Sequence, residues 1–518
     1  MYMEYCRENY FKSSKNVLHS MSVKFSVKIG KIEEETGVHV IPVYEDLISD
    51  PPIKLSEKIK KILEQVCGRE FKGRIEETYV LPTFLEKGPS RIVLTGLGKS
   101  SELELDSVRR AYGRAALKIE EMKFSSTYIP IPSLPYDIDL TIQTIVEGIL
   151  LSLYRFDRYK SEKEKQALEE VYFLVEDESK TGDIQRSIDL AEKICRGVYT
   201  ARDIANMPSN DCYPEKLAEM AIEVGSRAGF KVRIYKMDEL MEMEMGGIIA
   251  VGGGSNHKPV LIEMEYDGTC GGDKPYVIVG KAVTFDSGGI SIKPSEKMEE
   301  MKYDKSGGAA VIGIMEAAAL LKLPLRLIGL VPCVENMPSG TAYRPGDIVR
   351  FRNGKTAEII STDAEGRLIL ADALAYAVEK NPKVVIDLAT LTGACIIALG
   401  THASGLFTNN QQLADKIMKS SEKTGEKTWQ LPLWKQYKEQ IKSDVADLKN
   451  VGGRPAGAIT AAAFLSEFVR DAPWIHLDIA GTAYTQETSE QKSYIPKGAT
   501  GVGVRLIIDY LINELKQE

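Results

Sequence analysis

The sequence predicts an α/β protein built from two domains. The chain has 518 residues, which is more than one ordinary hydrophobic core accommodates. Hydrophobic residues make up 43% and charged residues 27%, a composition typical of soluble globular proteins. After residue 210, short apolar runs alternate with segments of helical spacing. This alternation predicts a mostly parallel sheet with helices on both faces.

The first domain is expected over residues 21–183. Apolar runs predict strands at Val38–Tyr44, Arg91–Leu97 and Val171–Val175, and helical spacing predicts helices at Ser107–Met122 and Leu140–Leu153. Residues 1–20 are polar and of mixed charge. They lack the apolar stretch of a signal peptide, so we expect an N-terminal extension there.

A connecting helix is expected over residues 184–207. Ile184–Asn206 has helical spacing and stops before Met207-Pro208, as a following proline favours. The second domain is then expected over residues 208–518, and it opens with a helix at Pro214–Ala228, where proline suits the first helical position.

The second domain alternates strands and helices. Strands are predicted at Val260–Tyr266, Tyr276–Val279, Leu325–Val331, Val384–Leu388 and Trp474–Ile479, and helices at Gly307–Leu321 and Ala371–Val378. In open α/β sheets, ligands bind beyond the carboxyl ends of the strands. Lys281 and Asp286 directly follow one of these strands, so a site is expected there.

Charge and cysteine content narrow the class of function. The net charge of −8 argues against a general affinity for nucleic acids, which requires a basic surface. The seven cysteines are odd in number and contain no CxxC pair, which favours a reduced, cytoplasmic setting. No run approaches the eighteen or so apolar residues that a membrane span requires, so no membrane association is expected.

Four carboxylates in short glycine-punctuated segments indicate the chemistry. Asp286, Asp304, Asp363 and Glu365 carry four negative charges, which two divalent metal ions would neutralise. With that balance, Lys281 need not be charged, and a metal at bonding distance would make it a neutral nitrogen ligand. The pattern therefore predicts a two-metal centre that hydrolyses an acyl bond.

Two cations remain beside this predicted centre. Lys293 and Arg367 are placed to bind a developing oxyanion or an exchangeable carboxylate-type base. The five histidines show no ligand spacing, which argues against a mononuclear zinc peptidase, and His476 is expected to be a core histidine.

Each acidic segment also has a simpler interpretation. Asp286 before Ser287-Gly288-Gly289 would suit an Asx turn, and Asp304 would suit a cap on the helix near Gly307. Asp363–Arg367 alone would suit a surface turn. The joint occurrence of all three beside two lysines favours the metal centre.

At these motifs the sequence resembles the cytosol aminopeptidase family. The matching segments are Asn206–Asn210 with Pro214, Lys281–Gly289, Lys293–Ser295, Met301–Asp304, Thr362–Leu368, Ala389–Gly393, Gly405–Asn409, Asp478–Gly481 and Lys497–Gly501. The resemblance covers roughly residues 195–515 and is weaker in the N-terminal third.

The resemblance implies roles for individual residues. One metal would be held by Lys281, Asp286, Asp304 and Glu365, and the other by Asp286, Asp363 and Glu365. Lys293 would polarise the substrate carbonyl, and Arg367 would hold a bicarbonate or water as general base. Met301, Thr390 and Gly393 would line a pocket for a Leu- or Met-like first side chain.

The resemblance also implies fold, cofactors and partners. It implies a macro-like N-terminal α/β domain, an αβα catalytic domain with a mostly parallel mixed sheet, and a homohexamer made of two trimers. Substrates would be peptides with a free N-terminus, and the metals manganese or zinc, with cobalt or magnesium possible. The alternative is a DNA-binding hexamer or a non-catalytic scaffold. The acidic charge argues against the first, and the intact set of site residues argues against the second.

Three positions depart from the family pattern. Ser361 stands where asparagine is usual, Ala282 where glycine is usual, and Lys305 where methionine is common. Lys305 is expected to point to solvent at the start of a helix. None of the three removes a predicted ligand, so activity is expected.

Overall fold

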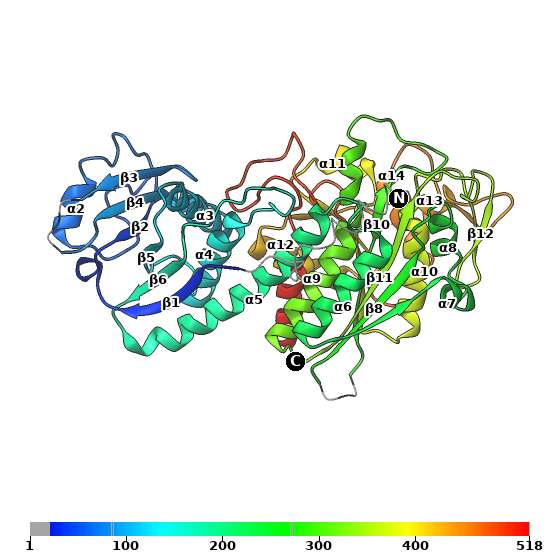
Figure 1. The fold of residues 1–518 in the computed structure, drawn as a ribbon, viewed down its shortest axis with the longest axis horizontal. Helices are drawn as coiled ribbons and strands as arrows, with labels where there is room; N and C mark the ends of the chain where they lie inside the picture. Colours follow the sequence, from blue (N-terminus) through cyan, green and yellow to red (C-terminus); the bar gives the residue numbers. More distant parts are fainter. Residues whose placement is uncertain (1–20, 84, 86, 270, 272, 517–518) are drawn as a thin grey trace.

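The computed structural model describes residues 21–83, 85, 87–269, 271 and 273–516, which form two α/β domains joined by a long helix (Figure 1). The expected extension over residues 1–20 lies outside the described residues. None of the helices in the described part of the chain combines the length and the hydropathy needed to cross a membrane.

The N-terminal domain contains a six-stranded sheet in the order β1-β6-β5-β2-β4-β3. All neighbouring strands are parallel except β3, which runs antiparallel to β4. The strands are β1 (Lys24–Ile29), β2 (Val38–Val43), β3 (Thr78–Pro82), β4 (Arg91–Gly96), β5 (Ser126–Pro130) and β6 (Glu170–Val175). The helical segments are η1 (Ile32–Glu34), α2 (Glu57–Leu63), η2 (Ser100–Glu102), α3 (Leu105–Glu121), α4 (Ile138–Leu153) and η3 (Glu178–Lys180).

Helix α5 (Thr181–Asn206) lies between the two sheets and packs against α4 on one side and α9 of the second domain on the other (Figure 1). It ends at Asn206, immediately before the Met207-Pro208 pair that predicted its end. The domain boundaries at residues 183 and 207 stay a prediction.

The second domain contains a nine-stranded mixed sheet whose main path is β16-β15-β18-β14-β9-β11-β8-β7, with β10 paired to β11. The central strands β18, β14, β9 and β11 are parallel. The strands are β7 (Lys231–Tyr235), β8 (Val260–Asp267), β9 (Tyr276–Gly280), β10 (Ala282–Asp286), β11 (Arg326–Asn336), β14 (Val384–Ala389), β15 (Ser404–Thr408), β16 (Thr428–Gln430) and β18 (Trp474–Asp478). A small separate sheet contains β12 (Ile348–Arg350), β13 (Thr356–Glu358) and β17 (Leu448–Lys449).

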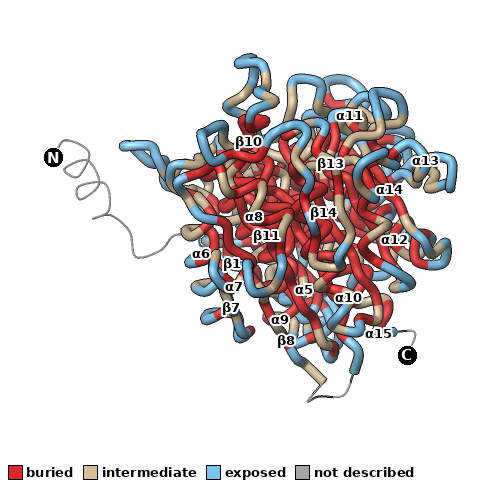
Figure 2. Tube along the Cα trace, turned by 90° about the vertical axis from the view of Figure 1, so that its right-hand side faces the viewer, coloured by how far each residue is buried: buried red, intermediate tan, exposed pale blue. Residues whose placement is uncertain are grey.

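Helices cover both faces of this sheet. The helical segments of this domain are α6 (Pro214–Ala228), α7 (Met237–Glu242), α8 (Gly246–Gly252), η4 (Met298–Lys305), α9 (Ser306–Leu321), α10 (Gly366–Glu379), α11 (Gly393–Leu399), α12 (Gln411–Thr424), α13 (Lys435–Glu439), α14 (Gly457–Ser466) and α15 (Val504–Leu515). Alternate residues of β9 enter two cores: Ile278 packs in the core that includes α5, α6 and α9, and Val277 in the core that includes α8, α10 and α14. Figure 2 shows this buried interior enclosed by exposed loops.

The predicted fold class is confirmed. Helix α6 has the predicted bounds, and α5, α9 and α10 begin one to five residues earlier than predicted. Strand β11 extends to Asn336, beyond the predicted end at Val331, and β10 was not predicted as a strand. Both differences matter for function, because these two strand ends meet at the site.

Candidate metal centre

The predicted ligands converge at the carboxyl ends of β9 and β10. Lys281 lies between these two strands, and Asp286 is the last residue of β10. Asp363 and Glu365 lie on the loop that enters α10, and Asp304 lies in η4. Residues from three segments of the chain therefore meet at one edge of the sheet, as expected for an open α/β fold.

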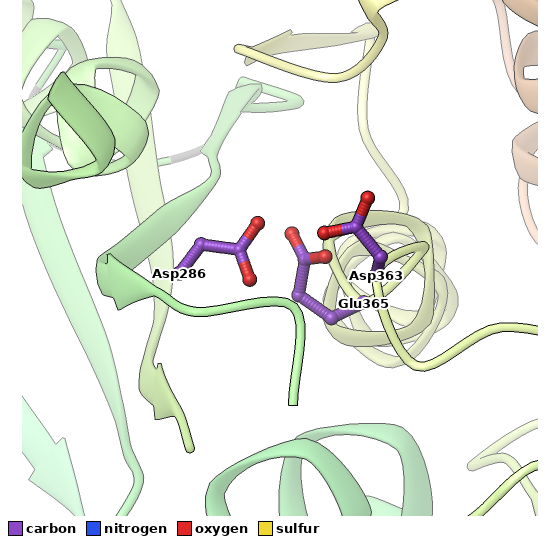
Figure 3. A group of neighbouring side chains, drawn as sticks. All are labelled: Asp286, Asp363 and Glu365. Atoms are coloured by element: carbon purple, nitrogen blue, oxygen red, sulfur yellow. The ribbon is translucent and has the colours of Figure 1, made fainter. Parts of the chain in front are cut away.

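Three of the carboxylates form a cluster. One oxygen each from Asp286, Asp363 and Glu365 lies within 4.8 Å of the other two. Figure 3 shows Asp286 facing Glu365 and Asp363 across a narrow gap. Asp286 and Glu365 are buried, whereas Asp363 is exposed. Carboxylates this close repel one another unless cations lie between or beside them.

Lys281 supplies one such cation. Its Nζ lies 2.8 Å from Asp304 Oδ1 and 2.8 Å from Glu365 Oε1, and it donates to the carbonyl oxygen of Thr390 at 2.8 Å. Burial acts to lower the pKa of Lys281, but the surrounding carboxylates outweigh burial and raise it. A Cβ at Gly366 would lie 2.5 Å from Lys281 Cε, so glycine is required there for the lysine to reach the cluster.

Lys293 supplies the second cation. Its Nζ lies 2.8 Å from Asp286 Oδ2 and 2.5 Å from Asp363 Oδ1. Burial acts to lower the pKa of Lys293, and the nearby carboxylates more than reverse this effect. Lys293 therefore contacts the cluster from its exposed side, whereas Lys281 contacts it from the buried side.

Two lysines do not fully satisfy the cluster. Asp304 Oδ2 and Glu365 Oε2 are buried and have no hydrogen-bond partner among the described residues. Burial raises the pKa of both Asp304 and Asp286 above the usual range of a carboxyl group. An oxygen-rich set with orphaned carboxylate oxygens and one amine fits divalent cations well.

Of the simpler interpretations of the acidic segments, the turn at Asp286 is present and the helix cap at Asp304 is not. Asp286 does form a turn, since the Gly288 N–H donates to its Oδ1 at 2.9 Å, but its Oδ2 still faces the cluster. Asp304 caps no helix: its Oδ1 accepts from Thr390 Oγ1 at 2.7 Å and contacts Lys281.

Arg367 lies in the first turn of α10. Its Nη1 donates to the carbonyl oxygen of Asn450 at 2.7 Å, whereas its buried Nε has no partner among the described residues. Burial lowers the pKa of Arg367 to about 10, against the attraction of Glu365. The guanidinium therefore retains donors for an anion.

The predicted pocket residues border the same centre. Thr390 contacts both Asp304 and Lys281, and Met301 lies half-buried in η4 with Asp304. Gly393 begins α11, and a Cβ there would meet no atom within 4 Å. The space beside Gly393 is thus open.

Two family models match this chain, one over each of its two domains. Residues 199–508 match the catalytic domain of the cytosol aminopeptidase family, and residues 40–163 match the N-terminal domain of that family. A probable cytosol aminopeptidase of Syntrophotalea carbinolica is 44% identical over 487 residues, which cover 93% of this chain and 97% of that protein. This chain belongs to the cytosol aminopeptidase family.

Other relatives agree with this assignment. A probable cytosol aminopeptidase of Cenarchaeum symbiosum is 48% identical over 461 residues, covering 88% of this chain and 92% of that protein. The solved structure of the bottromycin maturation enzyme BotP in complex with Mn is similar with a TM-score of 0.81 and 31% identity, covering 93% of this chain and 100% of that one. The chain is an aminopeptidase, an enzyme that removes residues from the N-terminus of peptides.

Two of the three departures from the family pattern are accommodated simply. Ser361 Oγ accepts from the Asp363 N–H at 3.3 Å, so the serine makes the local turn that an asparagine side chain also makes. Ala282 is buried in β10, and its backbone does not adopt a positive φ. Neither change displaces a cluster residue of this aminopeptidase.

The prediction that Lys305 points to solvent is wrong. Lys305 is fully buried, and its Nζ donates to the carbonyl oxygens of Met207 at 2.8 Å and Lys302 at 2.5 Å. Met207 follows the last residue of α5, where carbonyl groups lack helical partners and a cation is favourable. Lys305 therefore caps the connecting helix of the aminopeptidase from a distant segment.

Three residues that support the cluster were not predicted from the sequence. Asn336 Nδ2 donates to Asp286 Oδ1 at 2.8 Å and to the Thr362 carbonyl at 3.0 Å, and Tyr343 Oη donates to the same carbonyl at 2.7 Å. Asn450 contacts the loop before Asp363. The sequence could have indicated Asn336 only through its position at the end of a strand. The predicted strand ended at Val331, whereas β11 continues to Asn336.

Proposed function

We propose that this aminopeptidase works with two divalent metal ions held by Lys281, Asp286, Asp304, Asp363 and Glu365. The observation that carries the proposal is the clustering of these five side chains with two buried carboxylate oxygens left unpaired. Four carboxylates and two divalent ions would balance in charge. The ions would thus add to the neutralisation that the contacts of Lys281 and Lys293 with these carboxylates provide.

The ligands divide between two positions. Lys281 and Asp304 would belong to one metal and Asp363, through its side chain and main-chain carbonyl, to the other. Asp286 and Glu365 would contribute to holding both. The BotP structure contains Mn, which supports manganese here; zinc, cobalt and magnesium suit the same ligands.

When bound, the two ions supply a water of lowered pKa and positive charge that polarises the peptide carbonyl. Lys293 lies on the exposed side of the cluster, where it would donate to the carbonyl oxygen as negative charge develops there. The unpaired Nε of Arg367 would hold a bicarbonate or a water that accepts the proton of the attacking water.

Substrate preference would follow from the pocket. Met301, Thr390 and the open space at Gly393 form a small and largely apolar set, which suits Leu- or Met-like first residues. The free amino group of the peptide would bind beside the metals, which restricts cleavage to N-termini.

A homohexamer made of two trimers and a cytoplasmic setting complete the proposal. Large apolar side chains at Ile397, Trp429 and Trp434 are exposed on the single chain, as surfaces that associate often are. The relatives are named cytosol aminopeptidases.

The test compares a leucine anilide with its N-acetylated counterpart. Metal-stripped enzyme would be assayed with manganese or zinc added back, beside Asp286→Ala and Lys293→Ala variants. We expect cleavage of the free-amine substrate alone, dependent on added metal and absent in Asp286→Ala. Lys293→Ala should lower kcat by about 10²–10³-fold while still binding metal. Turnover that survives complete removal of metal would refute the two-metal proposal.

A further inference from the structure

Asn450 extends the small sheet toward the metal centre. It directly follows β17, and its main-chain N–H donates to the Glu358 carbonyl at 3.1 Å, which continues the pairing of β17 with β13. Beyond that point its side chain continues the same pairing. Oδ1 accepts from the Ile360 N–H at 2.8 Å, and Nδ2 donates to the Ser361 carbonyl at 2.7 Å.

The residues that Asn450 holds lead directly into the ligand loop. Ser361 is two residues before Asp363 and four before Glu365. Longer contacts from the same amide reach the Ser361 N–H at 3.4 Å and the Ala364 carbonyl at 3.5 Å. Asn450 is fully buried, so its removal would leave these backbone groups without water or another partner.

The main chain of the same residue fixes a second group. Its carbonyl oxygen accepts from Arg367 Nη1 at 2.7 Å. Arg367 lies two residues after Glu365, in the first turn of α10. One residue from a distant part of the sequence therefore anchors both the loop that carries two carboxylates and the guanidinium beside them.

We infer that Asn450 is a positioning residue that sets the geometry of Asp363 and Glu365 for metal binding. This inference rests on the proposed two-metal function. Residues that orient metal ligands without touching the metal typically change metal affinity 10- to 100-fold when they are substituted.

Asn409, which is exposed where Asn450 is buried, offers a control that is matched in its hydrogen-bond pattern. It follows β15, its Nδ2 donates to the Ala472 carbonyl at 2.9 Å, and its Oδ1 accepts from the Trp474 N–H at 2.9 Å. It thus joins two strands through the same pair of side-chain hydrogen bonds, but on a segment that carries no predicted ligand.

The experiment measures manganese affinity by titration calorimetry for wild type, Asn450→Ala, Asn450→Ser and Asn409→Ala, together with kcat, KM and thermal stability. We expect Asn450→Ala to bind manganese roughly 10- to 100-fold more weakly and to regain much of its kcat in excess manganese. Asn450→Ser should show a smaller loss, and it covers the case in which the alanine variant does not fold. Asn409→Ala should lose stability but keep wild-type affinity.

Wild-type manganese affinity in both Asn450 variants, or a loss equal to that in Asn409→Ala, would overturn the positioning role while leaving the proposed function intact. A wild-type enzyme that binds neither manganese nor zinc would overturn the proposed function, and this inference with it.

Discussion

His39 on β2 is a fully buried histidine with one hydrogen bond. Its Nε2–H donates to the Glu35 carbonyl at 2.9 Å, its ring stacks on Tyr128, and its Nδ1 has no partner among the described residues. Protonation would therefore bury an unpaired N–H. Burial accordingly lowers the pKa of His39 from 6.5 to about 4.

This shift makes stability depend on pH in a defined direction. Between pH 6.5 and 4 the unfolded chain holds a proton on His39 that the folded chain lacks, so the free energy of unfolding falls as pH falls. The contribution is on the order of 3 kcal/mol over that range. We expect His39→Phe to lose less stability than wild type between pH 7 and 4.5, as measured by calorimetry. His402→Phe, at an exposed histidine, is the control, and parallel acid profiles for wild type and His39→Phe would contradict the argument.

Single residues differ in how far the sequence reveals them. Asp286 and Lys281 were predictable because they follow an apolar run directly, and strand ends mark sites in this fold class. The burial of Lys305 was not predictable, because the Met207 carbonyl that accepts its hydrogen bond lies 98 residues away in sequence. Asn450 was missed for the same reason, since its amide acts on a loop 89 residues earlier.

At the scale of elements, α5 and α9 cross at a pair of glycines. A Cβ on Gly197 would lie 2.3 Å from the Gly313 carbonyl oxygen, and a Cβ on Gly313 would lie 2.3 Å from the Gly197 carbonyl oxygen. The opposing atoms are backbone, so no side chain can move aside. The two helices approach this closely only because both positions are glycine.

Gly313→Ala should therefore force the helices apart and lower the free energy of unfolding by about 1–3 kcal/mol. Gly182→Ala, in α5, is the control, because a Cβ there meets only Arg186 Nη1, at 3.7 Å. That variant should be neutral or slightly stabilised, since alanine favours helix over glycine. Thermal unfolding of both variants measures the difference, and equal stability would show that the crossing tolerates a methyl group.

Elements were predictable in proportion to their length and periodicity. The long helix α5 was evident because its helical spacing persists and a proline marks its end. Strands β12 and β13, of three residues each, and β17, of two, carry too little pattern to detect. Their arrangement matters because Asn450 directly follows β17 and is positioned by it beside the site.

At the scale of the whole molecule, one of the hydrophobic cores extends across both domains. Buried side chains form a continuous cluster from Val93 of the first sheet through Ile188 of α5 to Leu506 of α15. Charged groups bridge the same boundary: Glu147 on α4 contacts Arg109 Nε of α3 at 2.9 Å and Arg505 Nη1 of α15 at 3.3 Å. The N-terminal domain therefore supports the catalytic domain directly.

Glu147→Ala should test this coupling, because it leaves two buried guanidinium groups facing an empty position. Loss of one partner from a buried pair costs about 3–5 kcal/mol.

All three tryptophans lie in the second domain, at 429, 434 and 474, so tryptophan fluorescence follows the unfolding of that domain alone. We expect Glu147→Ala to lower the fluorescence transition although the substitution lies in the first domain. Glu164→Ala removes an exposed carboxylate 3.3 Å from Arg155 and should leave that transition unchanged. A fluorescence transition that stays in place while calorimetry shows an earlier transition would mean that the domains unfold independently.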